Sequence, residues 1–390
     1  MYDKQAQTAD ILKILEALVA FDTTSFKSNL DLIDFVAAKL EKAGANVHVL
    51  KAKDQPKANM VATFGPNVPG GVVLSGHTDV VPVEGQEWTC PAFEMTEKDG
   101  KLFGRGTADM KGFLAVALAH ADDFANASLK KPIHLAFSFD EEVGCTGIQE
   151  MLPFLSDYVA APRLVVIGEP TSMQVATAHK GQYVAKTRIV GREAHSSRPD
   201  DGVNAVVVAA ELIRYIDDMA SHVRQAGPFD ESFEPPHTTF NIGPISGGSA
   251  FNIISNKCEF DWEFRFLPDQ DGPAIIAAYM DHIEQKVLPT IKAKFPECDI
   301  TNEIWAYLPP LKADPGSDGE SFAMSLAQKN ESTVVAFGTE AGHFQGLSFP
   351  TVVCGPGDIA QAHKPDEFIE ISDLEACSRF MVRVREAMCQ

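Results

Sequence analysis

The sequence predicts an α/β protein, in which an α/β sandwich with a mixed, largely parallel sheet carries a second, inserted α+β domain. Short apolar runs, typical of buried strands, alternate with segments of helical periodicity in the first part of the chain. The pattern changes near residue 181, and the alternation resumes after residue 308. At 390 residues the chain is also long for one hydrophobic core, so two domains are expected.

The elements of the first part follow from local signals. Apolar residues at helical spacing from Ile11 to Val19 predict an amphipathic helix rather than a cleaved signal peptide. A second helix is expected to begin at Ser28 or Asn29 and to end at Gly44, before the strand-like NVHVL. Further strands are predicted at NMVATFG, GGVVLSG, PIHLAFSF and RLVVIG, with a helix at MKGFLAVALAHADDFAN.

A different order of elements follows from residue 181 to residue 308. The predicted succession is strand, helix, strand, strand, helix, strand, in QYVAKTRIVG, GVNAVVVAAELIRYIDDMASHV, TTFNIGPISG, NKCEFDWEFRFL, GPAIIAAYMDHIEQKVLPTIKAKF and DITNEIWAYL. A β-α-β-β-α-β order is that of a ferredoxin-like unit. The α/β elements resume with SFAMSLAQKN, STVVAFG, PTVVCG and a helix from about Asp373. We therefore expect a discontinuous domain, residues 1–180 and 309–390, with residues 181–308 inserted into it.

Charge and cysteine content exclude several classes of protein. The formal charge is −21, from 54 acidic and 33 basic residues, whereas non-specific binding to nucleic acid or anionic membranes needs a basic surface. No apolar run approaches the roughly 18 residues that span a bilayer. The seven cysteines form no CxxC pair, so we expect reduced thiols rather than a disulfide scaffold or a thiolate zinc site. A cytoplasmic protein without nucleic-acid or membrane partners is expected.

Polar side chains follow several predicted strands at the point where each ends. They are His77 and Asp79 after GGVVLSG, Asp140, Glu141 and Glu142 after PIHLAFSF, Glu169 after RLVVIG and His363 after PTVVCG, with Asp109 where FGRGTADMKG enters a helix. Each alone has an ordinary explanation as a turn residue, a loop histidine or a helix N-cap. Together, at the carboxyl ends of strands in one sheet, they form a nitrogen and oxygen ligand set suited to zinc, cobalt or manganese.

The spacing of His77 and Asp79 adds a second indication of a metal site. In this H-x-D pattern, Asp79 can accept the second ring N–H of His77 and so fix its tautomer. A phosphate-binding loop at GRGTADMKG is the weaker alternative, because the segment has neither GxGxxG nor GxxxxGKS/T spacing.

These residues lie in motifs that resemble a known family. The segments LSGHTDVVPVEGQEWTCPAFE, GRGTADMKG, DEEVGCTG, VVIGEPT and AHKP, in this order, are similar to the M20-like metallopeptidase family of aminoacylases, carboxypeptidase G2 and succinyl-diaminopimelate desuccinylase. The resemblance covers essentially the whole chain, insertion included. It implies a catalytic domain of the zinc-exopeptidase type, an inserted dimerisation and lid domain, and a homodimer.

The resemblance also implies roles at matching positions. Five residues would hold two metal ions: His77, Asp109 and Glu169 for one ion, and Asp109, Glu142 and His363 for the other. Zinc is expected first, with cobalt and manganese as alternatives. Glu141 would be the catalytic base that takes a proton from water and passes it to the leaving amine, and Asp79 would orient His77. A cis peptide bond is implied at Asp109–Met110.

One further candidate, His195, lies in the insertion. By resemblance it would stabilise the oxyanion of the reaction in the site of the partner subunit. From the pattern alone it is a loop histidine, beside Ser196 and Ser197 as helix caps.

The resemblance places substrate-binding residues at four other positions. Asn252 and Arg265 would hold the α-carboxylate of the substrate, and Gly338 and Thr339 match a loop that contacts it. From the pattern alone, Arg265 is an outward residue of an alternating strand. Glu340 is either the partner of a cationic substrate side chain or a solvated loop acid.

The chemistry implied by the family is hydrolysis of the amide bond of a small-molecule N-acyl amino acid. GEPT followed by AHKG, together with FGTEAGHFQ, is most similar to the branch that converts N2-acetyl-L-ornithine to acetate and L-ornithine in arginine biosynthesis. A related aminoacylase or desuccinylase, or a dipeptidase or carboxypeptidase, is the alternative. A non-catalytic binding protein is less favoured, because the candidate ligands and Glu141 are all present.

Overall fold

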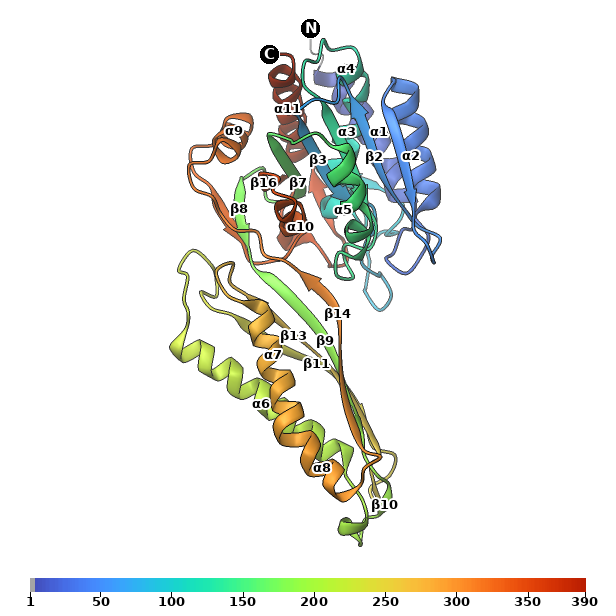
Figure 1. The fold of residues 1–390 in the computed structure, drawn as a ribbon. Coiled ribbons are helices and arrows are strands. Elements are labelled where there is room, and N and C mark those ends of the chain that lie inside the picture. Colours follow the sequence, from blue (N-terminus) through green and yellow to red (C-terminus); the bar gives the residue numbers. More distant parts are fainter. Residues whose placement is uncertain (1–3) are drawn as a thin grey trace. The chain divides into compact units, whose positions relative to one another are not determined.

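The computed structural model describes residues 4–390, and residues 1–3 of the N-terminal segment lie outside the described residues. The chain forms two compact units (Figure 1). Unit 1 comprises Met1–Ala178, Leu311–Val334 and Thr339–Gln390, and unit 2 comprises His179–Pro310 and Val335–Gly338. Each unit has its own hydrophobic core.

Unit 1 is organised around an eight-stranded sheet with the order β1-β2-β6-β3-β7-β16-β8-β15. Its strands are β1 (Asn46–Lys51), β2 (Ala58–Phe64), β3 (Val72–His77), β6 (Ile133–Ser138), β7 (Leu164–Pro170), β8 (Ala176–His179), β15 (Thr333–Val335) and β16 (Thr351–Gly355). The four central strands β6, β3, β7 and β16 are parallel, whereas β1, β2 and β8 pair antiparallel with their neighbours. The predicted mixed sheet is confirmed, and its four parallel strands end at one edge.

Helices cover both faces of this sheet, so β2 and β3 are buried at every position. One face packs against helices that share the main core: α1 (Lys4–Ala20), α2 (Leu30–Ala43), α3 (Gly112–Ala119), α4 (Ala121–Ala125), α9 (Asp318–Ala327) and α11 (Ile371–Met388). The other face carries α5 (Thr146–Tyr158) and α10 (Ala341–Gly346), as Figure 1 shows. Within residues 4–390, no helix has the length and apolar character needed to cross a membrane.

The ends of α2 illustrate how local signals act. The helix stops at Gly44, whose φ of 97° is the left-handed conformation that favours glycine. At its start, the Ser28 hydroxyl accepts a hydrogen bond from the Leu30 amide. The Asn29 side chain does not cap the helix but exchanges two hydrogen bonds of 2.9 Å with the Ala58 backbone, which ties α2 to β2.

Unit 2 is a four-stranded antiparallel sheet, with the order β11-β13-β9-β14, packed against helices. Its elements are β9 (Gly181–Val190), β10 (Ala194–His195), η2 (Pro199–Asp201), α6 (Ala205–Ala226), β11 (Thr239–Gly247), β12 (Ile253–Ile254), β13 (Lys257–Phe266), α7 (Gly272–His282), η3 (Ile283–Val287), α8 (Leu288–Lys294) and β14 (Asp299–Leu308). The predicted β-α-β-β-α-β order is confirmed. On β13, Trp262, Phe264 and Phe266 point into the core and alternate with half-buried polar residues.

Two features beside Asp109 depend on long-range contacts. A small sheet of β4 (Thr96–Lys98), β5 (Lys101–Phe103) and β17 (Phe368–Glu370), which the sequence did not predict, pairs Phe103 with Phe368. Between β5 and α3 lies η1 (Thr107–Lys111), where Asp109 has φ/ψ of −124°/93° and Met110 has −132°/32°. The peptide bond between them is cis, so that prediction is confirmed.

Candidate metal centre

The polar residues predicted at strand ends lie at the carboxyl edge of the parallel strands. His77 is the last residue of β3, Glu169 lies near the end of β7, and Glu141 and Glu142 lie in the turn after β6. His363 follows β16 and a short 3-10 helix, η4 (Ile359–Gln361). Because these strands are parallel, side chains from distant parts of the sequence meet at one place.

Asp109 lies between the two histidines. Its Oδ1 atom is 3.1 Å from His77 Nε2, and its Oδ2 atom is 3.3 Å from His363 Nε2. His77 Nε2 is also 3.4 Å from Glu169 Oε1, and His363 Nε2 is 3.0 Å from Glu142 Oε2. The five side chains therefore form two groups that share Asp109, with one of its carboxylate oxygens facing each group.

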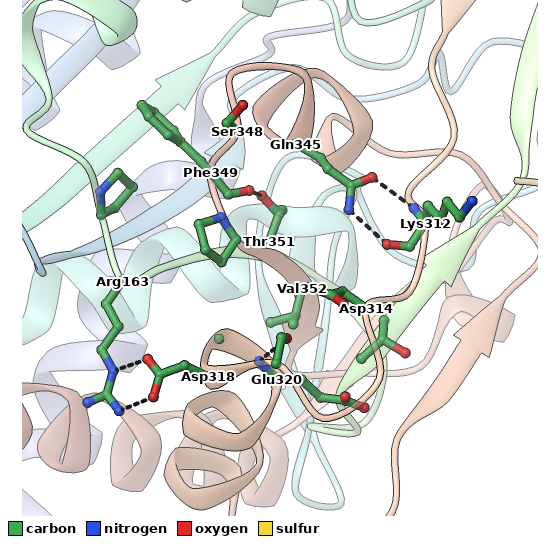
Figure 2. A pocket seen from close by; sticks show the side chains of 15 residues that line it. Arg163, Lys312, Asp314, Asp318, Glu320, Gln345, Ser348, Phe349, Thr351 and Val352 are labelled. Carbon is green, nitrogen blue, oxygen red and sulfur yellow. Dashed lines mark hydrogen bonds and ion pairs between the residues drawn. The ribbon is translucent and has the colours of Figure 1, made fainter.

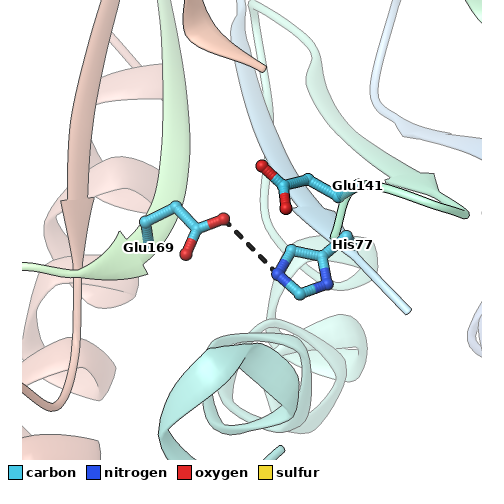
Figure 3. Close-up of side chains that lie close together, drawn as sticks. All are labelled: His77, Glu141 and Glu169. Atoms are coloured by element: carbon cyan, nitrogen blue, oxygen red, sulfur yellow. Dashed lines mark ion pairs between the residues drawn. The ribbon is translucent and has the colours of Figure 1, made fainter. Parts of the chain in front are cut away.

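The acidic turn after β6 directs its two glutamates to different groups. Glu142 faces His363, whereas a carboxylate oxygen of Glu141 lies within 4.8 Å of ligating atoms of His77 and Glu169. Figure 3 shows the carboxylates of Glu141 and Glu169 turned toward each other beside the His77 ring. One glutamate can thus act as a ligand of one group while its neighbour stays near the other.

The electrostatics of the cluster show an excess of negative charge. Burial raises the pKa of Glu142 and of Glu169 to about 7, and the Asp109 carboxylate adds to both shifts. Burial and the Glu169 carboxylate raise the pKa of Glu141 well above its usual value. Hydrogen bonds to Asp109 and Glu142 raise the pKa of His363 to about 11. Each of these pKa shifts favours the protonated form of the side chain, because a bound proton offsets the negative charge of the cluster. Divalent cations at the same place would offset that charge equally.

The donor set fits two divalent cations. It consists of imidazole nitrogens and carboxylate oxygens, which suit zinc, cobalt or manganese. The Cys145 thiol donates to Glu141 Oε1 at 3.4 Å, but burial and the neighbouring carboxylates raise the pKa of this thiol well above its usual value. Cys145 therefore stays protonated and adds no thiolate ligand.

Asp79 contacts both His77 and the acidic turn. His77 Nδ1 is 2.9 Å from the Asp79 backbone carbonyl and 3.6 Å from its carboxylate. Because a carbonyl only accepts hydrogen bonds, Nδ1 carries the hydrogen and Nε2 is left to face Asp109 and Glu169. The Asp79 carboxylate accepts from the Ser25 hydroxyl at 2.8 Å and from the amides of Glu141 and Glu142 at 3.1 and 3.3 Å.

Asp140, whose role the sequence left open, forms a buried ion pair with Lys57. Lys57 Nζ also donates to the Ser25 backbone carbonyl. Burial raises the pKa of Asp140, and the hydrogen bond from Lys57 opposes this rise. Sequence reasoning missed Lys57, which lies directly before β2, because no local signal marks a lysine that is buried only through its contact with a distant carboxylate.

Unit 2 brings His195 and Asn252 together. His195 in β10 pairs with Ile253 in β12, and the Ser196 amide donates to the Asn252 carbonyl at 3.0 Å. His195 is exposed, with Nδ1 2.8 Å from the Ser197 hydroxyl. The alternative in which Ser196 and Ser197 cap the following helix is wrong, because α6 begins only after Asn204, whose side chain accepts from the amides of the first turn.

The other predicted substrate contacts are divided between the units. In unit 2, Arg265 lies on the half-exposed face of β13, 3.6 Å from Glu263, and Gly338 ends the second segment of the unit. A Cβ at Gly338 would lie 3.0 Å from the Leu308 side chain, which would have to shift by a few tenths of an ångström to accommodate it. In unit 1, Thr339 is buried and its hydroxyl accepts from the Ala341 amide at 3.0 Å.

Glu340 is not a solvated loop acid, and that alternative is wrong. Its side chain is 1% exposed, and neither carboxylate oxygen has a hydrogen-bond partner of normal geometry among residues 4–390. Burial raises the pKa of Glu340 to about 7, and the Ser138 hydroxyl opposes this rise. The charge of Glu340 also acts on Glu141 and Glu169, so this carboxylate adjoins the candidate metal centre.

A separate cavity of unit 1, of about 480 Å³, contains none of the predicted site residues (Figure 2). Arg163 donates to both carboxylate oxygens of Asp318, at 2.7 and 2.8 Å. The Gln345 side chain exchanges hydrogen bonds of 2.9 and 2.8 Å with the backbone of Lys312. Because these lining groups bond to one another, the cavity is a weaker candidate than the strand-end cluster.

The chain is similar to known proteins over most of its length. Residues 73–387 match the model of peptidase family M20/M25/M40. The acetylornithine deacetylase of Myxococcus xanthus is 35% identical over 386 residues, which cover 96% of each protein. The acetylornithine deacetylase of Shigella sonnei (strain Ss046) is 34% identical and matches over 97% of each.

A solved structure shows the same fold at lower identity. The M20 family metallo-carboxypeptidase Sso-CP2 from Sulfolobus solfataricus has a TM-score of 0.76 at 16% identity, over 97% of this chain and 99% of that one. The fold predicted from the sequence is therefore found in a family whose members include metal-dependent peptidases.

Proposed function

Because this chain belongs to peptidase family M20/M25/M40, we propose that it hydrolyses N2-acetyl-L-ornithine to acetate and L-ornithine. The chain is a metal-dependent hydrolase, as its family and its relatives indicate. The substrate is carried by one observation, the identity of 33–35% to three acetylornithine deacetylases over almost the whole chain. A cytoplasmic role in arginine biosynthesis is part of the same proposal.

The proposed metal ligands are the two groups that share Asp109. Their members are His77, Asp109 and Glu169 for the first ion, and Asp109, Glu142 and His363 for the second. Zinc is the proposed metal, with cobalt and manganese as alternatives, and when bound these ions would supply Lewis acidity and would lower the pKa of a water. The chain holds His77 in the required tautomer through the contact of Nδ1 with Asp79.

Glu141 is the proposed general base. Its carboxylate lies within 4.8 Å of ligating atoms of His77 and Glu169, and its backbone amide donates to the Asp79 carboxylate at 3.1 Å. It takes the proton from the attacking water and later delivers it to the nitrogen of the leaving amine. His195 is proposed to stabilise the oxyanion, and Asn252, Arg265, Gly338 and Thr339 to bind the substrate.

A cationic substrate side chain has a proposed partner in Glu340. This carboxylate is buried and lacks a hydrogen-bond partner of normal geometry in the described part of the chain, so an ammonium group would satisfy it. The feature favours acetyl-ornithine over substrates with apolar side chains.

A comparison of rates across substrates tests the proposed specificity. With the zinc-loaded enzyme, we expect kcat/KM for acetyl-ornithine to exceed that for acetyl-methionine, succinyl-diaminopimelate and dipeptides by at least about tenfold, or roughly 1.4 kcal/mol. Glu340→Gln should reduce this preference mainly through the KM of acetyl-ornithine. If kcat/KM is higher for acetyl-methionine or a dipeptide, the proposal that acetyl-ornithine is the substrate is wrong. The proposed metal-dependent mechanism would not be affected by that result.

We also propose that unit 2 is a dimerisation and lid domain and that the enzyme is a homodimer. Strand β11 is an edge of its sheet and therefore leaves one row of backbone groups unpaired, which is a template for pairing with another chain. Apolar side chains are exposed nearby, with Ile245 on β11 and Val206 and Val207 on the first turn of α6. These features support an interface between two copies.

Mixing two inactive variants tests whether His195 acts across such a dimer. After subunit exchange, His195→Ala with Glu141→Ala should recover about a quarter of the wild-type rate, because half of the dimers are mixed and each has one complete site. Each variant alone, taken through the same exchange, is the control. No recovery, with mixed dimers demonstrated by mass spectrometry, would remove His195 from the partner's site.

A further inference from the structure

We infer that Arg105, Glu367 and Gln86 form a positioning network for Asp109 and His363. The inference rests on the proposed metal centre, in which these two residues are the ligands that no strand end holds. Asp109 lies in the irregular η1 and His363 in a loop after η4, whereas the other three proposed ligands lie in or just after central strands. The two ligands therefore need support from elsewhere in unit 1.

A buried ion pair joins the segments that carry the two ligands. Arg105 Nη1 is 2.8 Å from Glu367 Oε2, and both side chains are 1% exposed. The guanidinium also lies over the Trp88 ring, 5.0 Å from its centroid. Such a pair adds little net stability compared with apolar residues of the same volume, because desolvation offsets the attraction. Its effect is geometric, since it fixes the position of the Glu367 carboxylate.

The second oxygen of Glu367 holds the backbone of Asp109. Glu367 Oε1 accepts hydrogen bonds from the amides of Ala108 at 2.9 Å and Asp109 at 3.1 Å. At Asp109 the φ/ψ values are not helical, so the regular helical hydrogen bonds do not pair its amide. A side-chain acceptor such as Glu367 satisfies this amide instead. Holding the Asp109 amide limits the directions that its Cα–Cβ bond can take, and so helps to keep the carboxylate between His77 and His363.

Gln86 links the same ion pair to His363. Gln86 Oε1 accepts from Arg105 Nη2 at 2.6 Å and from Trp88 Nε1 at 3.1 Å, while Nε2 donates to the His363 carbonyl at 3.0 Å. Arg105 Nη1 also donates to the Lys364 carbonyl at 3.3 Å. His363 has a φ of 61°, a conformation that non-glycine residues rarely adopt, and its side chain is 55% exposed. These contacts hold its backbone where packing is sparse.

The network therefore acts on the site formed by Asp109, Glu142 and His363 more than on the site formed by His77, Asp109 and Glu169. Two ligands of the former site depend on it, and only the shared Asp109 does so in the latter. Residues that orient metal ligands typically change affinity by about 10–100-fold when they are replaced. The expected signature is a loss of affinity at one of two sites.

Titration of the metal-free protein with Zn²⁺, followed by calorimetry, measures both sites without reference to activity. Wild type is expected to bind two equivalents. Gln86→Ala, at a half-buried position, should weaken one site by about 10–100-fold and the other by less than about threefold. Glu367→Gln should weaken the same site further, because glutamine has one acceptor oxygen and cannot accept from Arg105 and from the Ala108 and Asp109 amides at once. The exposed Glu87→Gln is the matched control and should bind zinc as wild type does.

The outcomes separate this inference from the proposal on which it rests. If wild type binds two zinc ions and folded Gln86→Ala binds both as tightly, the positioning role is wrong. The same holds if both sites weaken equally, since a general loss of structure would do that. Circular dichroism establishes whether each variant is folded. If Glu367→Gln does not fold, the result for Gln86→Ala alone decides whether the network positions the ligands. A wild type that binds no zinc overturns the metal centre, and the network with it.

Discussion

Replacing Glu141 with glutamine should lower kcat by about 10²–10⁴-fold, the usual contribution of a general acid–base residue. The glutamine keeps the size of the side chain but can neither take a proton from water nor deliver one to the leaving amine. Metal binding should persist, because the five proposed ligands do not include Glu141 and the acidic turn is held by its backbone. Asp79 accepts from the Glu141 amide at 3.1 Å and from the Glu142 amide at 3.3 Å, and neither contact involves the substituted carboxylate.

The variant is assayed for steady-state rate and for bound zinc by elemental analysis. Glu150→Gln, the same substitution at an exposed position of α5, is the matched control and should keep wild-type activity. A Glu141→Gln enzyme with two bound ions and a near-normal rate would remove Glu141 from the proton transfers. Loss of metal together with activity would instead identify Glu141 as a ligand.

Removing the metal ions should abolish activity and destabilise unit 1. Without cations, the buried carboxylates repel one another. The folded protein can then reduce this repulsion only by binding protons at these carboxylates. A ligand at 100 times its dissociation constant adds about 2.7 kcal/mol, so we expect the melting temperature to fall by about 5–10 °C on chelation. Zinc or cobalt should restore both activity and stability.

The pH dependence of the metal-free protein follows from the same carboxylates. Glu142 and Glu169 have a pKa of about 7 when folded, against 4.5 for an ordinary glutamate. The folded state therefore binds more protons than the unfolded state between these values, and stability falls as pH rises through that window. We expect a lower melting temperature for the metal-free protein at about pH 8 than at about pH 5.

Scanning calorimetry with and without chelator measures these effects, and chelator already saturated with calcium is the control. Full activity after complete removal of metal, verified by elemental analysis, would exclude the metal mechanism. A metal-free protein whose melting temperature rises from pH 5 to pH 8 would show that the cluster does not carry the excess negative charge described above.

Local pattern was sufficient for most of the elements. Buried strands read as continuous apolar runs because both faces of the central sheet are covered, and α2 ends at Gly44 because glycine adopts the left-handed conformation at low cost. The small strands β5 and β17 were missed, since each has only three residues and the two are far apart in the sequence. The antiparallel flanks of the main sheet were likewise not legible, because pairing direction depends on connections rather than on composition.

The sequence by itself determined that acids and histidines follow the strands of an α/β sheet, because strand ends are marked by local apolar runs. The family resemblance implied that Asp109 is shared, but only the tertiary structure showed that one of its oxygens faces His77 and the other faces His363. The burial of Glu340 was likewise decided by the tertiary structure. It also supplied the partners Lys57 for Asp140 and Arg105 for Glu367, which are separated by 83 and 262 residues. Such pairs leave no periodic trace along the chain, since they depend on where loops meet after the sheet has formed.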